Sequence, residues 1–329
     1  MTTQAALTNA EYTELDKQRL APFGLTTTKS PFIEQAVQND EVYIHQPYAL
    51  YSEENHNSWK ELYARMQAPW AAHAPPQFLD GLKILQFDPH RVPRLDEVNK
   101  FLEASTRFKA RAVSGYVPSF VFFDCIAKRE FPTTITIRDA ATLNYLPEPD
   151  IFHDVAGHVP MHTDQRFTQA LVRFGACAYT AAKRVSLISD ETERLRCITS
   201  IFRAMARFFW FTVEFGLMPG DKPGEYKAYG AGLLSSPGEL VHSCTSSKVQ
   251  RFPFQMGWVV NQYFEIDHFQ PLLFVIDSLD HLYALTDELE QWMLSGKLDN
   301  VSPGEPTMNE ADMQSFLDAA SKLAAAAAS

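Results

Sequence analysis

Two histidines five residues apart lie in a short segment that is rich in carboxylates and prolines. His153 and His158 fall within PEPDIFHDVAGHVP. Pro149 suits the first turn of a helix, where its missing N–H needs no partner, and Pro160 ends the helix. On an ideal α-helix, residues i and i+5 lie about 140° apart. The two histidines can therefore bind one metal ion only if the helix is distorted, and Gly157 gives the backbone room for that distortion.

A carboxylate stands inside a strongly apolar segment farther along the chain. Glu214 lies in FFWFTVEFGL, and a buried carboxylate is costly unless it is paired or bound to a cation. One alternative is a salt bridge to Arg203 or Arg207, although both fit an exposed stripe of the helix better. Two histidines and one distant carboxylate also form the facial triad of non-haem Fe(II) oxygenases, which leaves other positions open for oxygen. We therefore predict that His153, His158 and Glu214 are catalytic metal ligands.

Three motifs occur in a fixed order along the chain: PEPDIFHDVAGHVP, WFTVEFGL, and KAYGAGLLSSPGEL at residues 227–240. Together they resemble the aromatic amino acid hydroxylases, especially the short bacterial phenylalanine hydroxylases, from about Tyr51 to about Pro271. The resemblance implies one catalytic domain of the α+β class, mainly α-helical with a few short strands. It also implies a monooxygenase that uses Fe(II), a tetrahydropterin and O2 to hydroxylate the ring of a free aromatic amino acid. Conversion of L-phenylalanine to L-tyrosine is the leading assignment.

The same resemblance places the pterin in a Gly- and Pro-containing loop that leads into a helix, within ARAVSGYVPSFVFFD at residues 110–124. Exposed backbone amides in such a loop suit a flat heterocycle, and an aromatic side chain suits its face. An ordinary turn is the alternative on the residues alone. The resemblance implies stacking on Phe122 and a contact through water from Asp154. The loop residues that it assigns to the pterin are Gly115, Tyr116 and Val117.

A charged pair is expected near the substrate. Arg138 ends a predicted strand twelve residues before Asp150, and a plain ion pair between the two is one interpretation. The resemblance implies in addition that Arg138 binds the substrate carboxylate while Asp150 holds the guanidinium in place. It further implies that Ser235 bonds to a ligand histidine and fixes its orientation. Other residues expected in the substrate pocket are Tyr145, Leu146, Trp210 and Gly232.

Several residues depart from the family pattern around the site. Ala156, Met161 and His162 replace bulky apolar residues, Phe209 replaces a tyrosine, and Ile266 resembles the tryptophan-specific choice. We expect Ala156 to enlarge the pocket or to reposition the ring. Hydroxylation of tryptophan, or of phenylalanine at C3, therefore stays open as an alternative. A zinc hydrolase that uses the same two histidines and the carboxylate is an alternative of a different class.

Composition limits the cellular setting and the partners. The chain has 329 residues, of which 46% are hydrophobic, and a net charge of −11. This charge argues against nucleic acid or an anionic membrane as a partner. No signal peptide and no transmembrane run is evident. The four cysteines have no CxxC spacing and are expected to be reduced. We predict a cytoplasmic enzyme that binds a small aromatic amino acid.

The predicted organisation is an N-terminal arm at 1–50, a catalytic iron and pterin domain at 51–300 and a helical tail at 301–329. Apolar spacing predicts helices near 53–66, 77–82 and 96–104 and amphipathic helices after residue 277. β-Branched residues predict a strand at 133–138, and alternation predicts another near 264–269. The tail is short and alanine-rich, so a monomer or dimer is expected rather than a coiled-coil tetramer.

The segment between the second histidine and Glu214 is longer than in the family. Residues 168–207 suggest two extended helices joined near SLISDE, which form a projecting hairpin. Such a hairpin is expected either to cover the active site or to form a subunit contact. The apolar stripe that would hold it together is Ala176, Ala178, Ala182, Leu195, Ile198 and Ile201.

Overall fold

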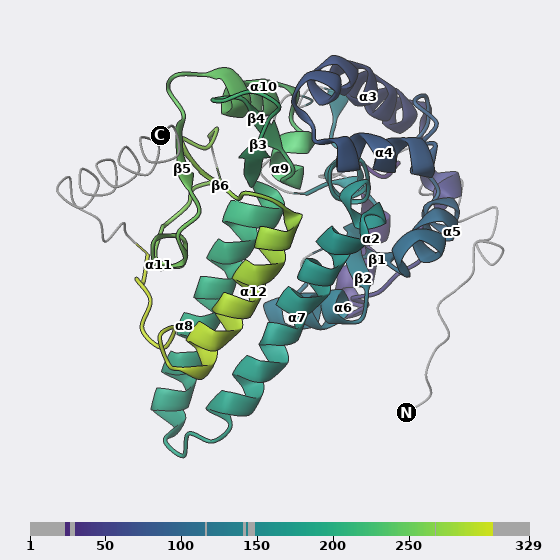
Figure 1. The fold of residues 1–329 in the computed structure, drawn as a ribbon. Helices are drawn as coiled ribbons and strands as arrows, with labels where there is room; N and C mark the ends of the chain where they lie inside the picture. The colour runs from purple at the N-terminus through teal and green to yellow at the C-terminus, as the bar shows by residue number, and fades with distance from the viewer. Residues whose placement is uncertain are drawn as a thin grey trace.

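The computed structural model describes residues 24–26, 30–115, 117–140, 143, 149–266 and 268–304. Helices dominate this part of the chain, and its short strands form two small sheets (Figure 1). The predicted mainly α-helical class with a few short strands is confirmed. Outside the described residues lie most of the first 29 residues of the predicted N-terminal arm and all of the predicted tail after residue 304. No helix in the described ranges is long and apolar enough to cross a membrane.

The helices of the N-terminal third support the segment that carries the two histidines. The longest of them starts with a capping box, in which Ser52 and Asn55 each accept a hydrogen bond from the other's backbone N–H. Its buried Trp59 and Trp70 pack on Phe152, with ring centroids 5.1 and 6.3 Å away. The helices predicted here are all present. The elements are α2 (Pro31–Gln38), η1 (Tyr48–Leu50), α3 (Glu53–His73), α4 (Pro76–Leu85) and α5 (Leu95–Thr106).

A two-stranded parallel sheet follows, with a helix as its crossover. Strand β1 (Lys109–Val113) pairs with β2 (Glu130–Thr134), and α6 (Ser119–Ala127) connects them. Residues 110–113 of the predicted loop therefore belong to β1. The observed strand β2 covers 130–134, which is earlier in the chain than the strand predicted at 133–138. The reason is that β1 ends at Val113, opposite Thr134, so the β-branched run continues without a partner strand. Its Ile137 is buried instead beside Leu25, whose carbonyl accepts from the Ile137 N–H.

A mixed four-stranded sheet forms the C-terminal part of the site's surroundings, in the order β4-β3-β6-β5. The strand predicted near 264–269 is wrong, because these residues form an irregular connection. Phe264 stacks on a neighbouring tryptophan, whereas Ile266 is 46% exposed. The elements are β3 (Leu217–Pro219), β4 (Tyr226–Ala228), α9 (Ala231–Leu234), α10 (Pro237–Thr245), β5 (Gln250–Pro253), α11 (Met256–Val259) and β6 (Leu272–Val275).

Long helices project from the rest of the molecule as a hairpin with a third helix packed along it (Figure 1). Helices α7 (Gln165–Val185) and α8 (Glu191–Phe209) form the predicted hairpin, and α12 (Leu279–Leu294) packs against α7. Arg173 of α7 donates to Asp287 of α12 at 2.7 Å. The expected place of Leu195 in the apolar stripe is wrong, because this side chain is 65% exposed near the hairpin tip. A short helix, η4 (Met161–Thr163), precedes α7.

Candidate metal centre and adjoining cavity

The two histidines lie on a π-helix, η3 (Phe152–His158). A π-helix repeats its hydrogen bonds between i and i+5, so residues five apart lie on the same face. This is the distortion that the spacing of His153 and His158 requires. Gly157 contributes through close packing, since a Cβ there would lie 2.9 Å from the carbonyl oxygen of Ala231. The buried Asp150 holds the start of the segment by accepting from the His153 N–H at 2.9 Å.

Glu214 ends a second π-helix, η5 (Trp210–Glu214), which continues α8. Its Oε1 lies 3.0 Å from His158 Nε2 and its Oε2 lies 3.4 Å from His153 Nε2. The two Nε2 atoms are 3.2 Å apart, and the three side chains offer ligand atoms that all lie within 4.8 Å of one another. The alternative salt bridge to Arg207 is wrong, because this side chain is buried and donates to the carbonyls of Val260 and Ser302.

The electrostatics of this cluster suit a cation. Burial alone would raise the pKa of Glu214, but the two histidines hold this pKa well below its usual range. Burial alone would lower the pKa of His153, but Glu214 and Asp154 raise it above its usual value. Two imidazole nitrogens and a carboxylate oxygen are a donor set for Fe(II) and for other borderline divalent ions. The three residues therefore fit one metal ion on one face of its coordination sphere.

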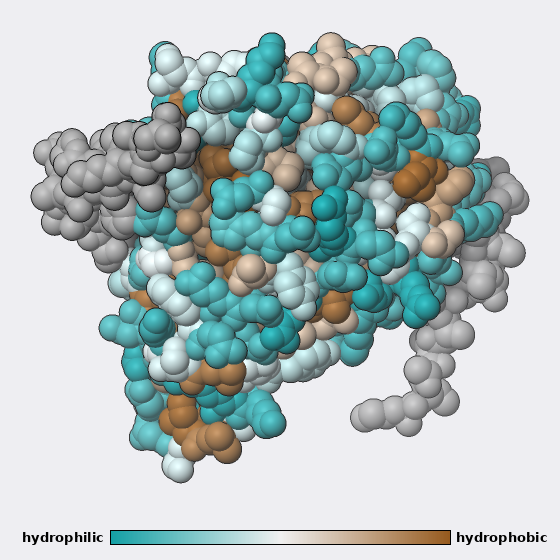
Figure 2. Space-filling model, viewed as in Figure 1, coloured by the Kyte–Doolittle hydropathy of each residue, from teal (hydrophilic) through white to brown (hydrophobic). Residues whose placement is uncertain are grey.

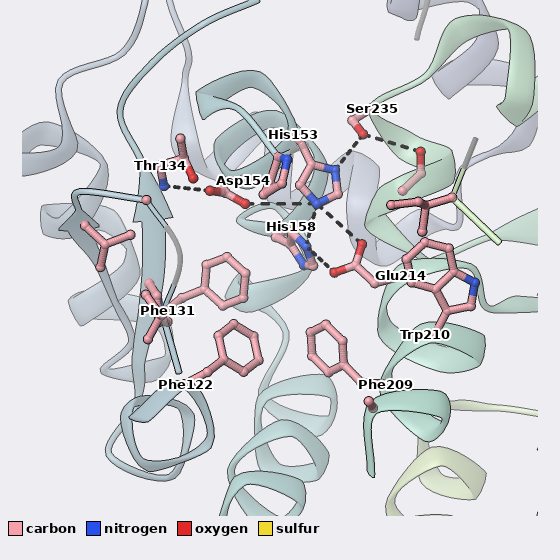
Figure 3. A pocket seen from close by; sticks show the side chains of 18 of the residues that line it. Phe122, Phe131, Thr134, His153, Asp154, His158, Phe209, Trp210, Glu214 and Ser235 are labelled. Atoms are coloured by element: carbon pink, nitrogen blue, oxygen red, sulfur yellow. Dashed lines mark hydrogen bonds and ion pairs between the residues drawn. The ribbon is translucent and has the colours of Figure 1, made fainter. Parts of the chain in front are cut away.

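Ser235 fixes the orientation of one histidine from the side away from the cluster (Figure 3). Its Oγ lies 2.9 Å from His153 Nδ1, and it is 3.4 Å from the Gly232 carbonyl oxygen. With Nε2 facing the metal position, Nδ1 carries the proton and donates to Ser235, which in turn donates to the carbonyl. Helix α9 and the start of α10 thus set which nitrogen of His153 is free to bind a metal.

The cluster opens into a cavity of about 790 Å3. On one side lie Gly115, Val117 and Phe122, the described residues of the predicted pterin set, together with Asp154. Figure 3 shows Phe122, Phe131 and Phe209 gathered below the metal ligands. The Phe122 ring makes T-shaped contacts with the rings of Phe131 and Phe209, with ring centroids 6.1 and 5.3 Å apart. Tyr116 lies outside the described residues.

Asp154 is buried beside the metal ligands, on the same π-helix. Its Oδ2 accepts from the backbone N–H of Thr134 at 2.6 Å, and its Oδ1 is 4.0 Å from His153 Nε2. Burial raises the pKa of Asp154 above its usual value. This carboxyl group therefore links the end of β2 to the cavity wall on the predicted pterin side.

The predicted ion pair on the substrate side is present. Asp150 accepts from Arg138 Nε at 2.7 Å and from Arg138 Nη2 at 2.8 Å, and both side chains are almost fully buried. Arg138 also lines the cavity, and among the described residues its Nη1 contacts the Leu143 carbonyl at 3.5 Å. The Nη1 and Nη2 edge of the guanidinium is therefore positioned by Asp150 and remains able to bind a second carboxylate.

Other predicted substrate residues line the same cavity, namely Trp210, Gly232, Ser235 and Ile266. Tyr145 and Leu146 lie outside the described residues. The expectation that Ala156 enlarges the pocket is wrong, because Ala156 is fully buried and is not among the described residues that line the cavity. Along the α7–α8 hairpin the described lining begins only at Ala206, so the hairpin tip does not cover the site.

Several residues of the cavity wall are not evident from the sequence. Phe264 stacks on Trp210 with centroids 4.2 Å apart, and Trp210 Nε1 donates to Gln270 Oε1 at 3.2 Å. Glu239 lies on α10 and accepts from the Gln270 backbone N–H at 2.9 Å. A single carboxylate within the apolar and small residues of LLSSPGEL was the available signal, and it was read only as part of the family motif.

Comparison with known proteins agrees with this architecture. A family model described as biopterin-dependent aromatic amino acid hydroxylase matches residues 32–295. The chain is 34% identical over 284 residues to a phenylalanine-4-hydroxylase of Chromobacterium violaceum, which covers 83% of this chain and 89% of that relative. It is 35% identical over 243 residues to a phenylalanine-4-hydroxylase of Ralstonia nicotianae, with coverages of 74% and 72%. A crystal structure of the Chromobacterium violaceum phenylalanine hydroxylase bound to cobalt matches with a TM-score of 0.70 at 33% identity, over 82% of this chain and 91% of that chain.

Proposed function

The chain belongs to the biopterin-dependent aromatic amino acid hydroxylases, and from this membership we propose that it converts L-phenylalanine to L-tyrosine. The pterin cofactor and a metal site follow from the family, and Fe(II) and O2 are our proposal for the metal and the co-substrate. The similar bacterial relatives are named for the phenylalanine reaction, so tryptophan hydroxylation and phenylalanine 3-hydroxylation are not favoured. Membership likewise leaves no support for a zinc hydrolase.

The observation that carries the proposal is the convergence of His153, His158 and Glu214 at one end of a cavity that also contains a prepared guanidinium. Ligands on a single face leave the opposite face of the ion toward the cavity. When bound, iron and the tetrahydropterin together supply the activation of O2 and the oxidation of the aromatic ring. The protein contributes binding, orientation and the exclusion of water.

Arg138 is proposed to bind the substrate carboxylate through the edge of its guanidinium that Asp150 leaves open. A bidentate contact of this kind fixes both position and rotation of the amino acid. Trp210, stacked on Phe264 and bonded to Gln270, is a rigid wall against which the substrate ring is held. Gly232 and Ser235 line the same side of the cavity.

The pterin is proposed to lie on the opposite side, on Phe122 and along the backbone of Gly115 and Val117. These two residues come two and four positions after the end of β1 and line the cavity. Asp154 is placed to contact the cofactor through water while it accepts the Thr134 N–H.

The direct test is aerobic turnover of the Fe(II)-loaded protein with tetrahydropterin. L-Phenylalanine, L-tyrosine and L-tryptophan are supplied separately, and products are identified by chromatography. We expect para-tyrosine from phenylalanine and no product from Glu214→Ala. Preferred formation of hydroxytryptophan or meta-tyrosine would refute the substrate assignment. Absence of coupled pterin oxidation with any of the three amino acids, in protein that retains iron, would refute the activity itself.

A further inference from the structure

The start of helix α10 has the sequence Ser236-Pro237-Gly238-Glu239, which matches the S-x-x-E pattern of a capping box. In a capping box the serine hydroxyl and the glutamate carboxylate bond to each other's backbone N–H groups. Neither bond is made here, since α10 has no side-chain cap hydrogen bond. Both side chains line the cavity instead. The two polar groups that ordinarily start a helix are therefore available for something else.

Ser236 and Glu239 are both buried and have few partners among the described residues. Ser236 is 6% exposed, and its Oγ has no hydrogen-bond partner in the described part of the chain. Glu239 is 2% exposed and accepts one hydrogen bond, from the Gln270 backbone N–H. No described lysine or arginine forms a salt bridge with Glu239. A buried hydroxyl and a buried carboxylate in this condition are costly unless a ligand completes their bonding.

The substrate brings the complementary charge. A free amino acid enters as a zwitterion, and its ammonium group must be satisfied once its carboxylate is bound at Arg138. The other described acidic side chains of the cavity wall are engaged elsewhere. Glu214 contacts both histidines, and Asp154 accepts the Thr134 N–H on the pterin side. Glu239 instead lies in the first turn of α10, which begins two residues after Ser235.

We propose that Glu239 and Ser236 form the subsite that binds the α-ammonium group of the amino acid substrate. The carboxylate of Glu239 accepts up to two N–H hydrogen bonds from the ammonium group. The hydroxyl of Ser236 accepts one more from the same group. Burial raises the pKa of Glu239 to about 7 in the free protein, so the arriving ammonium favours its ionised form. This inference rests on the proposed function, because it assumes a free amino acid as substrate.

The test compares two ligands that differ by the ammonium alone. L-Phenylalanine and 3-phenylpropanoate share the ring and the carboxylate, and their binding is measured by calorimetry on the full chain loaded with Fe(II) without oxygen. Glu239→Gln removes the charge and retains an oxygen for the Gln270 N–H. We expect its Kd for L-phenylalanine to rise about tenfold or more, in keeping with a lost hydrogen bond between charged groups. Its Kd for 3-phenylpropanoate is expected to stay unchanged.

Two further variants complete the design. Ser236→Ala is expected to weaken L-phenylalanine binding by a smaller factor, and again not that of 3-phenylpropanoate. Glu288→Gln removes the same charge from an exposed position on α12 and is expected to change neither Kd. If Glu239→Gln weakens both ligands equally, Glu239 acts only by positioning Gln270 and Trp210, and the proposal is overturned. Unchanged binding of both ligands overturns it as well.

The outcome is separable from the proposed function. If the wild-type protein forms tyrosine while Glu239→Gln retains full discrimination between the two ligands, this inference alone fails. If the wild-type protein forms no hydroxylated product, the proposed function fails, and the two binding constants still report whether Glu239 binds an ammonium group.

Discussion

Substitution of Ser235 by alanine tests how much of the metal affinity depends on one hydroxyl that does not touch the metal. The Oγ atom lies 2.9 Å from His153 Nδ1, within ordinary hydrogen-bond distance. Its second contact, to the Gly232 carbonyl, is long at 3.4 Å and contributes little. The variant therefore removes mainly the bond that holds the His153 tautomer and ring orientation.

Loss of such a partner to a metal-ligating histidine typically costs 10- to 100-fold in metal affinity, which is about 1.4 to 2.7 kcal/mol. The assay is competition between the protein and a chromogenic chelator for Fe(II), without oxygen and at constant pH. Ser243→Ala is the matched control, because Ser243 is also buried on α10 and its hydroxyl bonds to the Leu240 carbonyl, with a longer 3.9 Å contact to Cys244 Sγ, and not to a metal ligand. We expect a weaker Fe(II) complex for Ser235→Ala only. Equal affinities of the two variants for Fe(II) would refute the assigned orientation of His153.

Three further outcomes are expected for stability. Arg207→Met removes the donor to the carbonyls of Val260 and Ser302 and should lower the free energy of unfolding in urea by about 2–4 kcal/mol, so a loss below about 1 kcal/mol would contradict the contacts described. Leu187→Ser at the hairpin tip, where the side chain is 82% exposed, should change this free energy by no more than about 0.5 kcal/mol in the same titration. Burial raises the pKa of Glu239 from an ordinary value near 4.5 to about 7, although the hydrogen bond from the Gln270 backbone and the nearby His268 oppose this rise. Between about pH 4.5 and 7 the folded state then holds a proton that the unfolded state has lost. The metal-free protein should therefore lose about 3 kcal/mol of stability as the pH rises through this range. Thermal unfolding of Glu239→Gln should not show this loss.

Residue chemistry was a good guide where a single residue type was out of place in its surroundings. Glu214 was recognisable because a carboxylate stood in an apolar run, and the spacing of His153 and His158 required a distorted helix. Both expectations needed no knowledge of distant parts of the chain. The α7–α8 hairpin likewise follows from local apolar spacing, whereas the mainly α-helical class follows from the family resemblance.

The errors arose where a distant backbone decided the outcome. Arg207 was assigned to an exposed stripe, but its partners are carbonyls more than fifty residues away, and any residue type can supply a carbonyl. Glu239 stands at the glutamate position of a helix-capping pattern, but its carboxylate does not cap the helix. It accepts instead from the Gln270 N–H, thirty-one residues later in the chain. The strand predicted at 264–269 failed because alternation cannot show whether a partner strand is present.

The two ligand-bearing segments are both π-helical, at 152–158 and 210–214, and this has a consequence for how the site tolerates change in chain length. A π-turn contains one residue more than the α-turn that would replace it, and it forms mainly where function requires it. Deleting one residue from either segment would yield a more regular helix while rotating a ligand away from its partners. Such shortened chains should bind no metal, and because nearly every residue at 152–158 is buried, a deletion there should also lower the free energy of unfolding. The extra residue of each π-helix is therefore as necessary for metal binding as the ligand side chains themselves.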